Sequence, residues 1–208
     1  MIRALVCLLL GYLLGSLNPA ALISKLKGKD LREHETGNLG ASNTMLVFGK
    51  AMGALVLAFD MLKGFLAFKL ALWIAPEIKW AAMAAGFSAV LGHCFPFYLK
   101  FKGGKGLAAF AGVVLAYHPW LFLFLLITGM SLMVLVNHNF ILAYYAAAFF
   151  GVFVVVRETS LLLVIFAVAC TAVILIKHFE NLVKAVRKED ILIRDYIKTK
   201  FFHKSNAD

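Results

Sequence analysis

The chain has 208 residues, of which 62% are hydrophobic and only 15% are charged, and its mean hydropathy is +0.88. Soluble domains are about 45–50% apolar and about one quarter charged. A soluble fold of this size must cover its surface with polar groups, so the composition excludes a soluble protein and also a disordered chain. The sequence predicts an all-α polytopic integral membrane protein, with a single membrane domain over residues 1–208.

The formal net charge of +10 does not indicate a nucleic-acid partner. Basic residues occur in short clusters between apolar runs, a pattern that sets the topology of a membrane protein. Cys7, Cys94 and Cys170 lie far apart within or beside apolar segments and form no C-x-x-C pair. They predict buried packing thiols, and we expect neither a metal site nor a bound cofactor.

The first span is predicted over residues 3–24. Its uncharged stretch, Ala4–Ser24, has 21 residues and ends in a basic cluster. A cleaved signal peptide has a hydrophobic core of about 7–15 residues, so this segment predicts a retained span. The next two spans are expected at residues 51–76 and 80–99.

A run of 51 residues without Lys, Arg, Asp or Glu follows, from residue 106 to residue 156. Two polar or helix-breaking interruptions, Tyr117–Pro119 and Asn137–Asn139, divide it. The pieces 106–117, 119–136 and 140–156 give three crossings. A last span at 159–177 precedes a predicted cytoplasmic tail, 178–208, which makes about seven transmembrane helices.

The distribution of basic residues predicts the orientation. Residues 25–50, 100–105 and 177–208 contain 16 of the 21 Lys and Arg residues. Cytoplasmic loops carry the excess of Lys and Arg, so these segments are expected inside. The protein is therefore predicted to be N-out and C-in.

One predicted span is too short. Residues 106–117 would form about 18 Å of helix, whereas the hydrocarbon layer is about 30 Å thick. Irregular backbone at that depth is tolerated only where it lines a cavity or is buried in protein. The glycine-rich start of this segment should therefore be recessed, which predicts a pocket at residues 102–106.

The residues around this pocket are the polar cluster that most clearly indicates a binding site. Gly92–Pro96 contains His93 and precedes a second stretch, Lys100–Gly106. Glycines let backbone amides converge on an anion, and a following helix N-terminus adds its dipole. An ordinary basic loop with a packing histidine is the alternative. A nucleotide-binding P-loop is excluded, because Gly106 stands where that motif requires Ser or Thr.

Three further polar groups accompany it. The stretch Thr36–Asn43 predicts a polar loop shaped by its backbone, or alternatively a plain loop with a helix cap at Ser42 or Asn43. His178 and Asn181 share one face of the last helix and could equally be an interfacial polar belt. Asp60 and Lys63 are expected to pair with each other and hold helices together, or alternatively to take part directly in the chemistry.

Taken in chain order, these motifs resemble those of the bacterial acyl-phosphate:glycerol-3-phosphate acyltransferase family (PlsY). The resemblance covers G-N-x-G-A-[ST]-N at 37–43, D-x-x-K-G at 60–64, the Gly92–Pro96 and Lys100–Gly106 stretches, and Lys177–His178 with Asn181. It implies transfer of an acyl group from acyl phosphate to the 1-hydroxyl of glycerol 3-phosphate, giving lysophosphatidic acid for phospholipid synthesis. It also implies an inner-membrane enzyme among membrane lipids, with its site open to the cytoplasm.

The resemblance also implies roles for individual residues. Those expected at the reaction centre are His93, Lys105, His178 and Asn181. Those expected to bind substrate are Thr36, Gly37, Asn38, Gly40, Ser42, Asn43, Lys63, Lys102, Gly103, Gly104 and Gly106. The base would be a histidine or an oxygen of a substrate phosphate.

The sequence departs from the family's usual motifs at three places, as in a divergent member. Thr36 replaces the usual Ser, Leu46 replaces an Arg, and Asn137–Phe140 replaces Arg-Tyr-x-Ser. Leu cannot reproduce the paired hydrogen bonds of a guanidinium to a phosphate. The acyl-phosphate half of the site is therefore better supported than the acceptor half. An acyltransferase with another acceptor and a silent lipid-binding paralogue are the alternatives.

Overall fold

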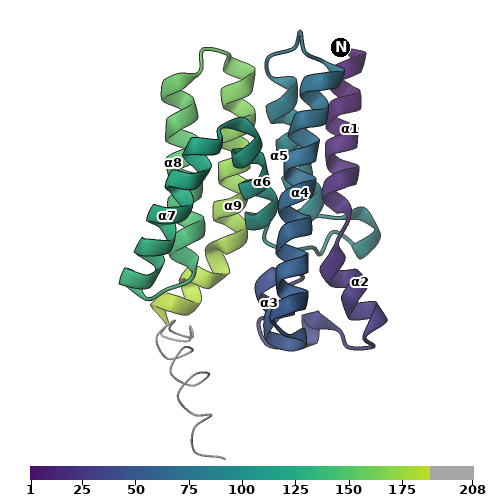
Figure 1. The fold of residues 1–208 in the computed structure, drawn as a ribbon, viewed down its shortest axis with the longest axis vertical. Coiled ribbons are helices and arrows are strands. Elements are labelled where there is room, and N and C mark those ends of the chain that lie inside the picture. The colour runs from purple at the N-terminus through teal and green to yellow at the C-terminus, as the bar shows by residue number, and fades with distance from the viewer. Residues whose placement is uncertain (188–208) are drawn as a thin grey trace, which may run out of the picture.

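The computed structural model describes residues 1–187, which form α-helices and two 3-10 turns and contain no strand (Figure 1). The elements are α1 (Ile2–Ser16), α2 (Pro19–Leu26), η1 (Leu31–Glu33), α3 (Ala41–Phe48), α4 (Lys50–Ile74), α5 (Ala81–Cys94), η2 (Phe97–Leu99), α6 (Leu107–Tyr117), α7 (Pro119–Val136), α8 (Phe140–Arg157) and α9 (Leu161–Val186). The predicted all-α class is confirmed.

Five segments of the described chain are long and apolar enough to cross a membrane: Ile2–Leu26, Ala81–Leu99, Pro119–Val136, Phe140–Arg157 and Leu161–Val186. The 25 residues of α4 give a helix of about 37 Å, although it carries ionisable residues. The 11 residues of α6 give only about 16 Å, as expected for the short segment. The count of seven spans and the N-out orientation stay predictions.

Two predicted spans are interrupted in the structure. The first breaks between α1 and α2 at Leu17, because the Asn18 side chain accepts a hydrogen bond from the Ala21 amide at 2.8 Å and Pro19 has no N–H. The span predicted at 80–99 is helical only to Cys94, where the following Phe95–Pro96 pair disfavours helix, and then turns through η2.

The last helix is longer than predicted. Its expected end was residue 177, but α9 continues to Val186, so the part of the proposed tail that directly follows residue 177 is helical. Residues 188–208, the rest of that tail, lie outside the described residues. His178 and Asn181 consequently stand on a continuous helix.

The centre of the bundle is α5, a helix rich in alanine that is buried over most of its length and packs against α1, α4, α6 and α9. A Cβ atom placed on Gly15 would lie 2.0 Å from the Ala89 carbonyl oxygen. A Cβ atom on Gly112 of α6 would lie 1.9 Å from the Met61 oxygen of α4. Backbones approach this closely only where one residue is glycine, so the G-x-x-x-G pair at Gly11 and Gly15 allows the close packing of α1 on α5.

Residues 25–50 and the described part of the last basic segment lie at the same end of the molecule. Figure 1 shows α2, α3 and the C-terminal end of α9 at the lower end, opposite the N-terminus. The connection between α7 and α8 lies at the same end. This arrangement agrees with the common side that the basic clusters predict for these loops.

Replacing Gly15 with Ala should destabilise the bundle. The added Cβ would overlap the backbone of α5, and overpacking of this kind costs about 1–3 kcal/mol. Thermal unfolding in detergent should show a lower midpoint for Gly15→Ala. The control is Gly129→Ala, whose Cβ meets only the movable side chains of Leu142 and Tyr145. Equal midpoints for the two variants would contradict the tight contact.

Candidate active site

A chain of three buried ionisable residues lies beneath the glycine-rich loop. Lys63 Nζ is 2.7 Å from Asp60 Oδ1 and also donates to the Leu17 carbonyl at 2.7 Å. His93 Nδ1 lies 3.3 Å from the same Asp60 oxygen, without the alignment of a hydrogen bond. All three side chains are at most 3% exposed. The expected pairing of Asp60 with Lys63 is confirmed, and Lys63 has no surface for substrate.

His93 supports the glycine-rich loop from below. Its carbonyl accepts the Gly104 amide at 3.1 Å, and the neighbouring Cys94 carbonyl accepts the Gly103 amide at 3.1 Å. A Cβ atom on Gly104 would lie 2.2 Å from His93 Nε2 and 2.8 Å from the Leu39 oxygen. The amides of Gly103 and Gly104 therefore hold the loop, which corrects the expectation that they converge on an anion.

The start of α6 offers other hydrogen-bond donors for an anion: the amides of its first turn and the ammonium group of Lys105. Gly106 is its N-cap with φ of +85°, a left-handed conformation that suits glycine, and no described side chain caps its first turn. The unfilled amides of a helix N-terminus carry a partial positive charge. Lys105, the residue before the cap, contacts Asn181 Oδ1 on α9 through its ammonium group. The predicted anion site at Lys105–Gly106 thus has a physical basis.

His178 and Asn181 of α9 complete this side of the site. His178 Nδ1 is 2.9 Å from the Ile174 carbonyl. When Nδ1 carries the proton and donates to that carbonyl, Nε2 is left as an acceptor. The charges of Lys105 and Lys177 both act on this ring. The structure therefore brings Lys105, His178 and Asn181 together, as predicted.

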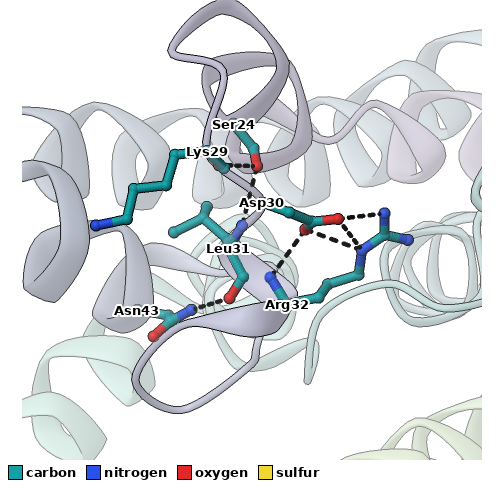
Figure 2. A network of polar contacts seen from close by, with 6 residues as sticks. All are labelled: Ser24, Lys29, Asp30, Leu31, Arg32 and Asn43. Carbon is teal, nitrogen blue, oxygen red and sulfur yellow. Dashed lines mark hydrogen bonds and ion pairs between the residues drawn. The ribbon is translucent and has the colours of Figure 1, made fainter.

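The first motif forms a loop held by buried polar side chains (Figure 2). Asn43 is fully buried, donates to the Leu31 carbonyl at 2.8 Å and accepts the Thr36 amide at 3.0 Å. Ser24 donates to the Lys29 carbonyl at 2.7 Å and accepts the Leu31 amide at 3.0 Å. Asn43 thus braces the loop with both ends of its amide, rather than presenting it to a ligand. Its predicted role as a helix cap is wrong, because the N-cap of α3 is Gly40.

The outer part of this loop carries a second polar cluster. Asp30 accepts hydrogen bonds from the Arg32 side chain, the shortest of them 2.7 Å, and from the Arg32 amide. These bonds lower the pKa of Asp30 to about 2, so the carboxylate remains ionised at neutral pH. The pair lines a cavity of about 430 Å³ between α2 and the loop, together with Lys25 and Lys29.

The other predicted residues differ in position. Thr36, Gly37, Ser42 and Lys102 are exposed, Asn38 and Gly103 are partly exposed, and Gly40, Gly104 and Gly106 are buried. Two residues that position the loops, Asn18 and Tyr98, are not among the predicted site residues. Asn18 approaches the Leu39 carbonyl at 3.5 Å, and Tyr98 donates to the Ser16 carbonyl at 2.7 Å while accepting the Asn18 amide. The Asn18–Pro19 pair inside an apolar run is a dipeptide typical of turns, so it could have indicated the break in the first span.

Comparison with known proteins decides the family. The sequence model described as glycerol-3-phosphate acyltransferase matches residues 5–188. The chain belongs to the glycerol-3-phosphate acyltransferase family.

Relatives and a solved structure agree with this membership. The glycerol-3-phosphate acyltransferase of Streptococcus mutans is 32% identical over 92% of this chain and 94% of its own length. That of Aquifex aeolicus is 34% identical over 86% of this chain and 94% of its own length. The crystal structure of PlsY, an integral membrane glycerol 3-phosphate acyltransferase in its glycerol 3-phosphate form, is 32% identical, with a TM-score of 0.85 over 91% of this chain and 95% of that chain.

This family membership makes the protein an acyltransferase of the membrane. The likeness also extends to the lysophosphatidic acid form of PlsY, with a TM-score of 0.83 and 30% identity over 93% of this chain and 96% of that chain. The helical integral membrane fold predicted from composition is therefore confirmed.

Replacing Asn43 with Ala should loosen the first-motif loop. The Leu31 carbonyl and the Thr36 amide would lose their partner, and an unsatisfied buried polar group costs about 1–3 kcal/mol. We expect faster hydrogen exchange of residues 31–40, measured by mass spectrometry. Ser131→Ala, which removes an exposed hydroxyl that donates to the Ile127 carbonyl of the same helix, is the control. Unchanged exchange in the Asn43 variant would contradict the bracing role.

Proposed function

We propose that this protein transfers a fatty acyl group from an acyl phosphate to the 1-hydroxyl of glycerol 3-phosphate, forming lysophosphatidic acid and inorganic phosphate. The observation that carries the proposal is the contact between Lys105 and Asn181 beside the uncapped start of α6. This arrangement offers a full positive charge and a helix N-terminus to one phosphate group. The names of the relatives supply the acceptor.

The chemistry needs no acyl-enzyme, because an acyl phosphate is already an activated mixed anhydride. The acceptor oxygen attacks the carbonyl carbon, the bond from that carbon to the phosphate oxygen breaks, and phosphate leaves with the electron pair. Lys105 and the first amides of α6 would stabilise the negative charge that grows on the leaving phosphate. The acceptor proton would pass to His178 Nε2 or to a substrate phosphate oxygen.

An apolar hollow follows the phosphate site along α6. It is lined by Leu107, Phe110, Ala111 and Val114 of α6, by Phe122, Leu125 and Leu126 of α7, and by Leu142 and Ala146 of α8. Its first residue, Leu107, stands two positions after Lys105. A donor with its phosphate at Lys105 would therefore place its acyl chain between these helices. This fits a substrate with an anionic head and an apolar tail.

The expected location follows from charge. The loops that carry Lys105 and Thr36–Asn43 belong to the basic segments, which are predicted to face the cytoplasm. We therefore place the protein in the bacterial inner membrane with its site open to the cytoplasm. Both substrates are anionic, so a basic face would also concentrate them.

Release of phosphate from a long-chain acyl phosphate tests the proposal. Purified protein should release phosphate when glycerol 3-phosphate is added, and Lys105→Ala should reduce the rate at least about 100-fold, since it removes the main charge at the leaving group. The control is Lys69→Ala, an exposed lysine of α4 that lies over the Phe65 ring. Release that is unaffected by Lys105→Ala would overturn the assignment.

A second candidate keeps the donor and changes the acceptor. Leu46 lies partly buried on α3, and Phe140 is buried at the start of α8 against His138 and Tyr144. Both positions carry apolar side chains where the family resemblance implies contacts to the acceptor's phosphate. Neither side chain can donate a hydrogen bond.

An acceptor screen separates the two candidates. Glycerol 3-phosphate, glycerol and other small alcohols would be compared by kcat/KM at a fixed concentration of acyl phosphate. The proposed function predicts that glycerol 3-phosphate is the best acceptor. A better acceptor without phosphate would favour the second candidate. Binding of acyl phosphate without turnover on any acceptor would instead indicate a silent paralogue.

A further inference from the structure

The buried chain of Asp60, Lys63 and His93 joins the two loops that the proposed reaction needs. On one side Lys63 holds the Leu17 carbonyl at the break between α1 and α2, next to Asn18, which approaches the Leu39 carbonyl of the first-motif loop. On the other side His93 lies under Gly104, the neighbour of Lys105. Asp60 is the group that both sides share.

The two sides meet again above the chain. A Cβ atom on Gly104 would approach both His93 Nε2 and the Leu39 carbonyl oxygen, so the two loops touch at this glycine. A movement of His93 would therefore shift Gly104 against Leu39. Lys105 would move with it, because it is the next residue in the chain. The geometry around Asp60 is thus transmitted to the phosphate site within a few contacts.

Stability alone does not explain an ionic chain at this place. A buried ion pair contributes little net stability, and a well-packed apolar pair of similar volume often serves a fold as well or better. Ionisable residues within membrane helices are costly and mark functional positions. The imperfect contact between Asp60 and His93 also leaves two buried polar atoms short of an aligned partner.

We propose that Asp60 is a positioning residue, which acts through His93 on Gly104 and so sets where Lys105 presents its ammonium group. The inference rests on the proposed function, since it concerns the phosphate site of that reaction. Asp60 and Lys63 themselves are buried and touch no substrate. Their effect on catalysis would be indirect and would depend on Lys105.

A double-mutant cycle measures this dependence. Asp60→Asn keeps the side-chain volume and removes the charge, and we expect it to lower kcat/KM for the acyl phosphate at least about tenfold, chiefly by raising KM. In the background of Lys105→Ala the same change should cost less than about twofold, because the group that Asp60 positions is gone. Glu77→Gln is the matched control, since this exposed carboxylate pairs with the exposed Arg3 of α1.

A second variant separates positioning from folding. The paired change Asp60→Leu with Lys63→Met removes both charges and should keep the thermal midpoint while reducing kcat/KM as Asp60→Asn does. If both sets of variants lose the fold, the chain of charges serves the fold and the inference is wrong. The inference would also be wrong if, in folded protein, Asp60→Asn lowered kcat/KM by the same factor in the Lys105→Ala background as in the wild type. Wild-type protein that releases no phosphate would instead overturn the proposed function, and this inference with it.

Discussion

The ion pair of Asp60 and Lys63 inside α4 is the interaction on which the geometry of the site depends. Two opposite charges can stay buried at this depth only while each has a partner, and breaking such a pair costs about 3–5 kcal/mol. Lys63 finds its second partner in the carbonyl that the break at Leu17 leaves without a helical bond, and Asp60 finds His93 nearby. The interrupted helix, the buried charges and the glycine-rich loop are therefore linked by direct contacts and depend on one another. Small residues on α1, α5 and α6 let the backbones come close enough to build it.

The polar residues of the site fall into two groups with different roles. Asn43, Ser24, Asp60 and His93 use their polar atoms on the protein itself, so they shape loops. Lys105, His178 and Asn181 lie around the open start of α6, where a phosphate group would find charge and hydrogen-bond donors. Catalysis of acyl transfer from an activated donor requires mainly such positioning and electrostatic stabilisation. The first group would supply the positioning, and the residues around the start of α6 would supply the electrostatic stabilisation.

Much of this could be predicted from the sequence, because membrane segments leave strong local signals. Runs of apolar residues and their breakers predicted α7 at its observed bounds, and they also predicted the short α6. Contacts between distant segments leave no such signal. Whether the amides of Gly103 and Gly104 face a ligand or the carbonyls of His93 and Cys94 depends on the path of the chain after Pro96, which periodicity does not describe. The same holds for Asn43, whose residue type suits a ligand contact, a cap and a buried brace equally well. The motif spacing predicted a set of site residues, and only the folded chain separates those whose polar atoms are used within the protein, such as Asn43, from those around the start of α6, such as Lys105.

Binding without reaction shows most directly whether the buried charges set up a phosphate site. A long-chain acyl phosphonate presents an anionic head and an apolar tail but cannot transfer its acyl group. Its affinity for wild-type protein, Asp60→Asn and Glu77→Gln can be measured by calorimetry in detergent. Wild type and Glu77→Gln should bind it alike, whereas Asp60→Asn should bind it at least about tenfold more weakly while remaining folded. Equal affinity of all three proteins would contradict this role of the buried charges.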